Sequence, residues 1–213
     1  MSFRPNGQLD PQSLVVQSIG RVDWKPVGHC GQVTLNVSCR RNGMSPNIES
    51  AFSQIGERVL RTLREIPSPD GTVYACGFWL FYCDYTVLTP PCFAYNIVGK
   101  EQDAKWCPPE WIVDVENRMV DALKPIYQEL SDLMKGQNDE AWESLIRYQW
   151  DFYSQLCLAI TRDARSLLSH WRLAGDFVCG IFEDRESEEV YTSLVLSSVG
   201  EQAALQLGIL PSS

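Results

Sequence analysis

Histidine is almost absent from this chain, which contains only His29 and His170 among its 213 residues. The two lie far apart, and neither has a second histidine one helical turn away, as zinc-binding helices require. The eight cysteines include no Cys-x-x-Cys pair, the usual signature of a zinc or redox site. The sequence therefore predicts no bound metal ion and no cofactor.

Motifs for nucleotide binding and for nucleophilic catalysis are missing as well. Neither GxGxxG nor GxxxxGK[ST], the loops that hold phosphates before a helix, occurs, and there is no Gly-x-Ser-x-Gly elbow. Ser169 and His170 are adjacent on a predicted helix, where neighbouring side chains do not face each other. None of these patterns predicts a catalytic site.

Export and membrane signals are not found either. The amino terminus lacks the apolar segment of a secretory signal peptide. No stretch of the sequence is both long and apolar enough to span a bilayer as a helix. These features predict a cytoplasmic protein with reduced cysteines.

Basic residues are scarce, because 18 Lys and Arg stand against 27 Asp and Glu, for a net charge of −9. The excess lies from Glu101 onward, where 20 acidic residues accompany 9 basic ones. Such a surface repels nucleic acid and anionic membranes, so neither is an expected partner. It suits a basic protein partner, although charge of this kind alone more often serves solubility.

Hydrophobic periodicity predicts an α+β fold in a single domain over residues 1–213. The sheet is expected to be mostly antiparallel and packed against several helices, with residues 1–45 as an appended β-hairpin or arm. Apolar runs and alternation predict strands near 14–19, 32–39, 73–82, 86–95 and 177–182. Helical spacing predicts helices over 48–66, 116–135, 140–171 and 188–197, with a further turn at 201–207.

The stretch 72–111 combines a buried aromatic strand with a tryptophan-rich closing segment. In that segment Glu110 lies between Pro109 and Trp111, with Trp106 nearby. A carboxylate fixed in this way is suited to anchoring an arginine of a partner or to lining a pocket. Alternatively, Glu110 caps the following helix or pairs with Lys105 while the tryptophans close the core, as buried tryptophans commonly do.

The segment 183–189 is the densest acidic patch of the chain. Runs of this kind are mostly solvated faces, but a basic partner would be expected here first. We therefore predict a partner-binding surface made by the acids of this segment together with the tryptophan-flanked carboxylate: Glu183, Asp184, Glu186, Glu188, Glu189, Glu110, Trp106 and Trp111.

One weak catalytic pattern remains in the chain. Asp70, Asp103 and Lys105 superficially match the two carboxylates and lysine of metal-dependent nucleases. Such sites need both carboxylates around one Mg²⁺ ion. Asp70 belongs to an Asp-Gly turn and Asp103 to a polar loop, so chance explains the match better.

Three segments together resemble the bacterial domain-of-unknown-function family 4303. They are the strand from Val73 to Phe78, the sequence Phe93-Ala94-Tyr95-Asn96, and the motif Lys105-Trp106-Cys107-Pro108-Pro109-Glu110-Trp111. The resemblance extends over roughly residues 48–210, and residues 1–45 lie outside it.

This resemblance implies a non-catalytic immunity protein, of the kind found beside polymorphic toxins and type VI secretion effectors. The family offers no catalytic residues to transfer to this chain. Two other function classes stay open: a metal-dependent hydrolase or nuclease using Asp70, Asp103 and Lys105, and a housekeeping protein-interaction domain.

Overall fold

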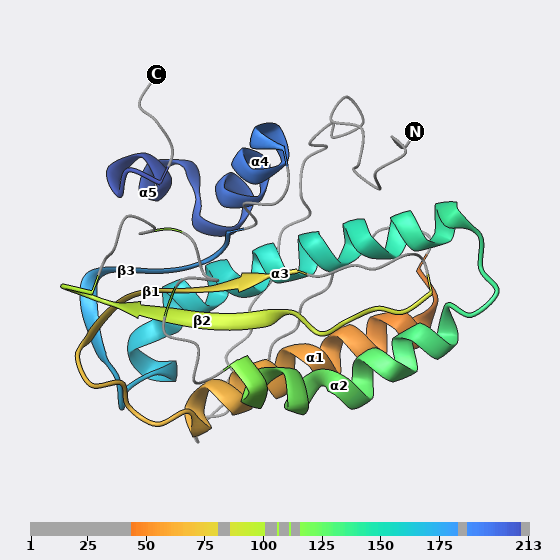
Figure 1. Ribbon diagram of the computed structural model, residues 1–213, viewed down its shortest axis with the longest axis horizontal. Coiled ribbons are helices and arrows are strands. Elements are labelled where there is room, and N and C mark those ends of the chain that lie inside the picture. Colours follow the sequence, from red (N-terminus) through yellow and green to blue (C-terminus); the bar gives the residue numbers. More distant parts are fainter. Residues whose placement is uncertain are drawn as a thin grey trace.

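The computed structural model describes residues 44–80, 86–100, 106, 111, 116–182 and 187–209. This part of the chain contains five helices and three strands and confirms the α+β class (Figure 1). The elements are α1 (Pro46–Glu65), β1 (Thr72–Trp79), β2 (Cys92–Ile97), α2 (Glu116–Leu133), α3 (Asp139–Leu167), β3 (Arg172–Ile181), α4 (Glu188–Val199) and α5 (Glu201–Gln206). None of the described helices combines the length and the apolar character needed to cross a bilayer.

The described sheet is mixed, so the prediction of a mostly antiparallel sheet is wrong. Its strand order is β2-β1-β3, with β1 antiparallel to β2 and parallel to β3. The parallel pair, β1 and β3, is joined in the chain through β2, α2 and α3. A connection of this length lets β3 run in the same direction as β1, whereas a short hairpin joins only antiparallel strands.

The strand boundaries differ from the predicted ones where proline and a turn intervene. The strand predicted over 86–95 begins only at Cys92, because Pro90 and Pro91 have no N–H group to donate to a ladder. The strand predicted over 73–82 is observed as Thr72–Trp79, and residues 81–85 lie outside the described residues. The strands predicted at 14–19 and 32–39, and all of the 1–45 arm except Met44 and Ser45, also lie outside them.

The third strand begins before its predicted position, at Arg172 instead of residue 177. Helix α3 correspondingly ends at Leu167, not at 171. The apolar residues Leu168 and Trp171 continue the helical spacing in the sequence. In the structure both are buried, but they lie in the turn that follows the helix. The Gly175-Asp176 turn signal marks a bulge inside the strand, since Val73 pairs with Leu173 while Ala75 pairs with Val178.

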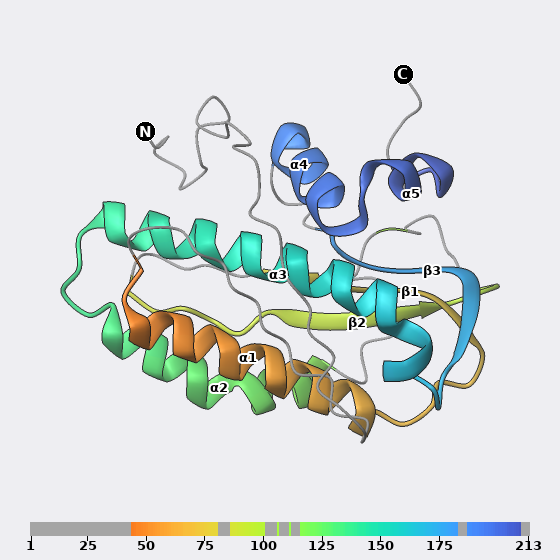
Figure 2. The ribbon, with the colours of Figure 1, turned by 180° about the vertical axis from the view of Figure 1, so that it is seen from behind.

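The two faces of the sheet carry separate hydrophobic clusters. The larger cluster joins α1, α2 and α3 to side chains such as Phe78, Phe93 and Ile181. The second cluster joins α5 and the later part of α4 to Trp79, Ala94 and Phe182. Figures 1 and 2 show α4 and α5 on the side of the sheet away from α1 and α2. The second layer is therefore thinner and is made largely by the carboxyl-terminal helices.

Helix α4 is attached to the outer edge of β3 through hydroxyl groups. Ile181 donates its backbone N–H to Ser198 Oγ at 2.9 Å, and Cys179 donates its N–H to Thr161 Oγ1 of α3 at 2.8 Å. Ser154 of α3 and Ser197 of α4 also hydrogen-bond at 2.9 Å. An edge strand whose N–H groups are satisfied in this way is protected against pairing with another chain.

Gln149 of α3 is fully buried, and its amide has no hydrogen-bond partner in the described part of the chain. A buried amide without a partner costs about 1–3 kcal/mol. Gln149→Met keeps the side-chain length and removes the amide, so we expect it to raise the free energy of unfolding by about 1 kcal/mol. Urea unfolding measures this change, with Gln54→Met on the exposed face of α1 as the control; lower stability of Gln149→Met would contradict the interpretation.

Candidate interaction surface

The structure describes only part of the predicted partner-binding set. Glu188 and Glu189 form the first turn of α4 and are exposed. Ser187 begins this helix, as predicted, because its Oγ accepts a hydrogen bond from the Val190 N–H. Carboxylates in the first turn of a helix interact favourably with its dipole, which explains why they stand here. Four predicted residues lie outside the described part of the chain: Glu110, Glu183, Asp184 and Glu186.

The two predicted tryptophans belong to the second hydrophobic cluster. Trp111 is buried, and its ring centroid lies 5.6 Å from that of Phe182. Trp106 keeps part of its surface accessible and packs on Phe182 at 5.7 Å and edge-on against Tyr74 at 5.6 Å. Trp106 and Trp111 therefore pack in the same cluster as α5 and the later part of α4.

Phe182 is the residue that joins these parts, and the sequence interpretation did not single it out. It is fully buried and lies over two glycines, Gly77 and Gly180, which face each other across β1 and β3. A Cβ atom on Gly77 would stand 2.7 Å from the Phe182 ring, and one on Gly180 would stand at the same distance. The signal in the sequence was the presence of a glycine in the interior of each of two apolar strands.

A bulge in β1 brings Tyr74 into the same layer. Opposite β2, Val73 pairs with Ile97 and Ala75 with Asn96, so the register shifts at Tyr74. The alternation of side chains is broken at this point, and Tyr74 joins Ala75 in the second cluster. A regular strand would have turned Tyr74 toward the opposite face.

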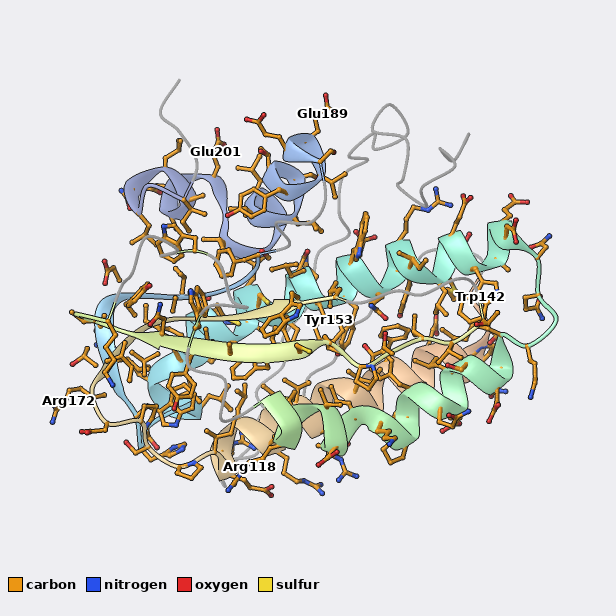
Figure 3. The ribbon with its side chains drawn as sticks, viewed as in Figure 1. Arg118, Trp142, Tyr153, Arg172, Glu189 and Glu201 are labelled. Atoms are coloured by element: carbon orange, nitrogen blue, oxygen red, sulfur yellow. The ribbon has the colours of Figure 1, made fainter. Side chains whose placement is uncertain are left out.

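The outer side of this layer, which we call the α4–α5 surface, combines carboxylates with exposed leucines. It consists of Glu188, Glu189, Leu196, Glu201 and Leu205. Leu196 is 38% exposed and Leu205 43%, and both belong to the few large hydrophobic side chains that the described residues expose. Figure 3 shows Glu189 and Glu201 pointing away from the sheet on the same side of the molecule. Apolar side chains rimmed by charged ones are typical of protein-binding surfaces.

Three of the residues on the α4–α5 surface were not predicted as part of a site: Leu196, Glu201 and Leu205. The available signal was the composition of α4, in which six of twelve residues are apolar and no basic residue stands in the last turn. A short surface helix with this composition buries one side against its own domain. Its remaining apolar side chains are then left in contact with solvent.

The alternative catalytic set is only partly described. Asp70 is exposed in the turn before β1, and Asp103 and Lys105 lie outside the described residues. His170, predicted as a surface or helix-end residue, follows α3, and its Nε2 lies 2.9 Å from the Ile66 carbonyl oxygen. Within the described ranges, no group of three or more His, Cys, Asp or Glu side chains is arranged to hold a metal ion.

Three buried thiols meet between the sheet and α3. Cys76 and Cys179 are opposite each other on β1 and β3, and Cys157 of α3 hydrogen-bonds to Cys179. Burial raises the pKa of the Cys76 and Cys157 thiols, and their hydrogen bonds to Cys179 raise it further. Burial opposes ionisation of Cys179 too, but the two thiols directed at its sulfur lower its pKa. Buried thiols of this kind act as small core side chains.

Comparison with known proteins identifies no relative, since no family model, no curated protein and no solved structure matches the chain. The resemblance to the domain-of-unknown-function family therefore stays a prediction from sequence motifs.

Proposed function

We propose that this protein is an immunity protein that binds a cognate bacterial toxin acting in the cytoplasm and neutralises it by covering its active or substrate surface. A nuclease delivered by a type VI secretion system is the kind of toxin that fits best. The protein has no catalytic role in this proposal.

The observation that carries the proposal is the α4–α5 surface. It exposes the apolar side chains of Leu196 and Leu205 together with the carboxylates of Glu188, Glu189 and Glu201. A solubility surface needs the carboxylates but not the exposed leucines. The combination favours a partner that brings apolar side chains surrounded by positive charge.

A nuclease meets this requirement because it binds the phosphate backbone of its substrate with lysine and arginine side chains. An acidic protein that occupies the same surface excludes the nucleic acid sterically and through like-charge repulsion. The net charge of −9 would also accelerate the encounter with a basic toxin. The acids of 183–186, next to α4 in the sequence, and Glu110 with the partly accessible Trp106 are proposed to extend the contact, whereas Trp111 is buried against Phe182.

The proposal is tested with the product of the gene next to the one that encodes this protein. The purified neighbour is expected to bind this protein with one-to-one stoichiometry and to lose its toxic activity as the protein is added. Association should slow as salt is raised, because charge steers the encounter. If the neighbour neither binds nor loses activity, the proposal fails.

A further inference from the structure

A pocket lies at the end of the molecule where α1 begins and α2 turns into α3. Its volume is about 410 Å³, within the range of roughly 300–1,000 Å³ that is usual for small-molecule sites. Its lining comes from α1, α2, α3 and the turn between α2 and α3, so it shares no residue with the α4–α5 surface. Trp142, in the first turn of α3, marks this end of the molecule in Figure 3.

The inner wall of the pocket is apolar and adaptable. It is made by Met44, Ile48, Leu133 and Met134. Met134 and Ile48 are buried, while Met44 and Leu133 are half-buried and face the space. Methionine is flexible and polarisable, and it makes favourable contacts with both aliphatic and aromatic groups. This wall is therefore suited to the non-polar part of a ligand.

Among the residues that line the pocket, Glu140 is the one with an acidic or basic side chain. Glu140 is exposed at the start of α3, and its backbone carbonyl accepts a hydrogen bond from Ser144 Oγ at 2.8 Å. Asp139 precedes it, and Glu49 lies in the first turn of α1, which begins at the same pocket. Lys135 is the basic residue of the turn between α2 and α3.

Two helix amino termini also face the pocket, and their partial positive charges would by themselves favour an anion. One N–H group of each terminus is engaged by a capping side chain, since Ser45 Oγ accepts from the Ile48 N–H and Asn138 Oδ1 from the Ala141 N–H. Full negative charges on Asp139 and Glu140 outweigh the half charge of the α3 terminus. The pocket is consequently negative, which favours a cation.

We propose that this pocket binds an amphiphilic cation, with its non-polar group against the methionine wall and its ammonium or guanidinium head at Glu140. Such a head is carried both by free aliphatic amines and by the lysine and arginine side chains of proteins. A free amine and a basic side chain of a protein would use the same apolar wall and the same carboxylate of Glu140. The site is independent of the proposed immunity function, because it uses other elements.

The four methionines of the chain allow a direct test, since Met44 and Met134 line the pocket while Met119 is buried elsewhere and Met1 begins the chain. In the full-length protein labelled at its methionine methyl groups, n-hexylammonium is expected to shift the signals of Met44 and Met134 and to leave that of Met119 unchanged. Neutral n-hexanol, of the same length, should bind at least severalfold more weakly. Glu140→Gln should weaken n-hexylammonium binding about fivefold, whereas Glu57→Gln on α1 should not.

A blocked lysine, Nα-acetyl-lysine methylamide, distinguishes the two sources. Binding of both probes would assign the pocket to basic side chains as well as to free amines, and binding of n-hexylammonium alone would restrict it to free amines. The proposal is overturned if neither probe shifts Met44 and Met134, if n-hexanol binds equally well, or if Glu140→Gln has no effect. If the protein did not bind the toxin, the immunity proposal would fail, but the results of this ligand-binding test would still decide the proposal for the pocket.

Discussion

Replacement of Glu188, Glu189 and Glu201 by lysine is expected to weaken binding of the cognate toxin about 10- to 100-fold. The three carboxylates stand on the outer side of the second layer, where they would meet positive charge on the partner. Reversal turns each attraction into a repulsion, and the effect should be strongest on the association rate. Surface plasmon resonance at low and physiological salt measures both rate constants.

A matched variant separates the position of these charges from their number. Glu57, Glu65 and Glu129 are exposed on α1 and α2, on the other side of the sheet. Replacing these three by lysine changes the net charge by the same amount but leaves the α4–α5 surface intact. The control is expected to lose little affinity. Equal losses in both variants would mean that net charge alone, and not this surface, drives binding. Thermal unfolding must show that both variants remain folded.

Phe182→Ala is expected to lower the free energy of unfolding by about 3–5 kcal/mol, the cost of removing a fully buried aromatic side chain. The ring contacts Trp106 and Trp111 above and lies over Gly77 and Gly180 below. Its loss leaves a cavity at the centre of the second cluster. Urea unfolding followed by tryptophan fluorescence measures the change. Leu205→Ala, at an exposed position, should alter stability by less than about 0.5 kcal/mol.

The glycine beneath the ring provides a specific check on this interpretation. Gly77→Ala places a methyl group 2.7 Å from the ring and is expected to cost about 1–3 kcal/mol. In the Phe182→Ala background the same methyl group enters the vacated space, so most of this cost should disappear. If Gly77→Ala lowers the free energy of unfolding equally with and without the Phe182 ring, the close packing of the ring on Gly77 is not the cause of the destabilisation.

The helices were predictable because the apolar residues of a buried helix face recur every three to four positions in the sequence. The predicted helices 48–66 and 188–197 are observed within a few residues, as Pro46–Glu65 and Glu188–Val199. Local signals also located the expected turn at 201–207, where α5 forms. The mixed sheet was not predictable, because strand direction depends on the crossover through α2 and α3 and not on the strands themselves.

The candidate surface was predictable only in part, for a related reason. Glu188 and Glu189 stood out by their charge, and Trp106 and Trp111 by their motif, but no local pattern joined the two groups. The structure packs Trp106 and Trp111 on Phe182, which lies over the paired Gly77 and Gly180 of two parallel strands, whereas the acidic turn of α4 is followed by Val190 and Leu194 of the larger cluster. Leu196 and Leu205 carry no signal that separates them from core leucines, and the packing of α4 and α5 leaves them exposed.

Hydrogen–deuterium exchange of the wild-type protein with and without its toxin tests the central claim most directly. The account predicts that toxin binding slows exchange of backbone amides in α4 and α5, while those of α1 and α2 keep their rates. Protection on α1 and α2 with none on α4 and α5, or no protection anywhere in the presence of saturating toxin, would contradict it.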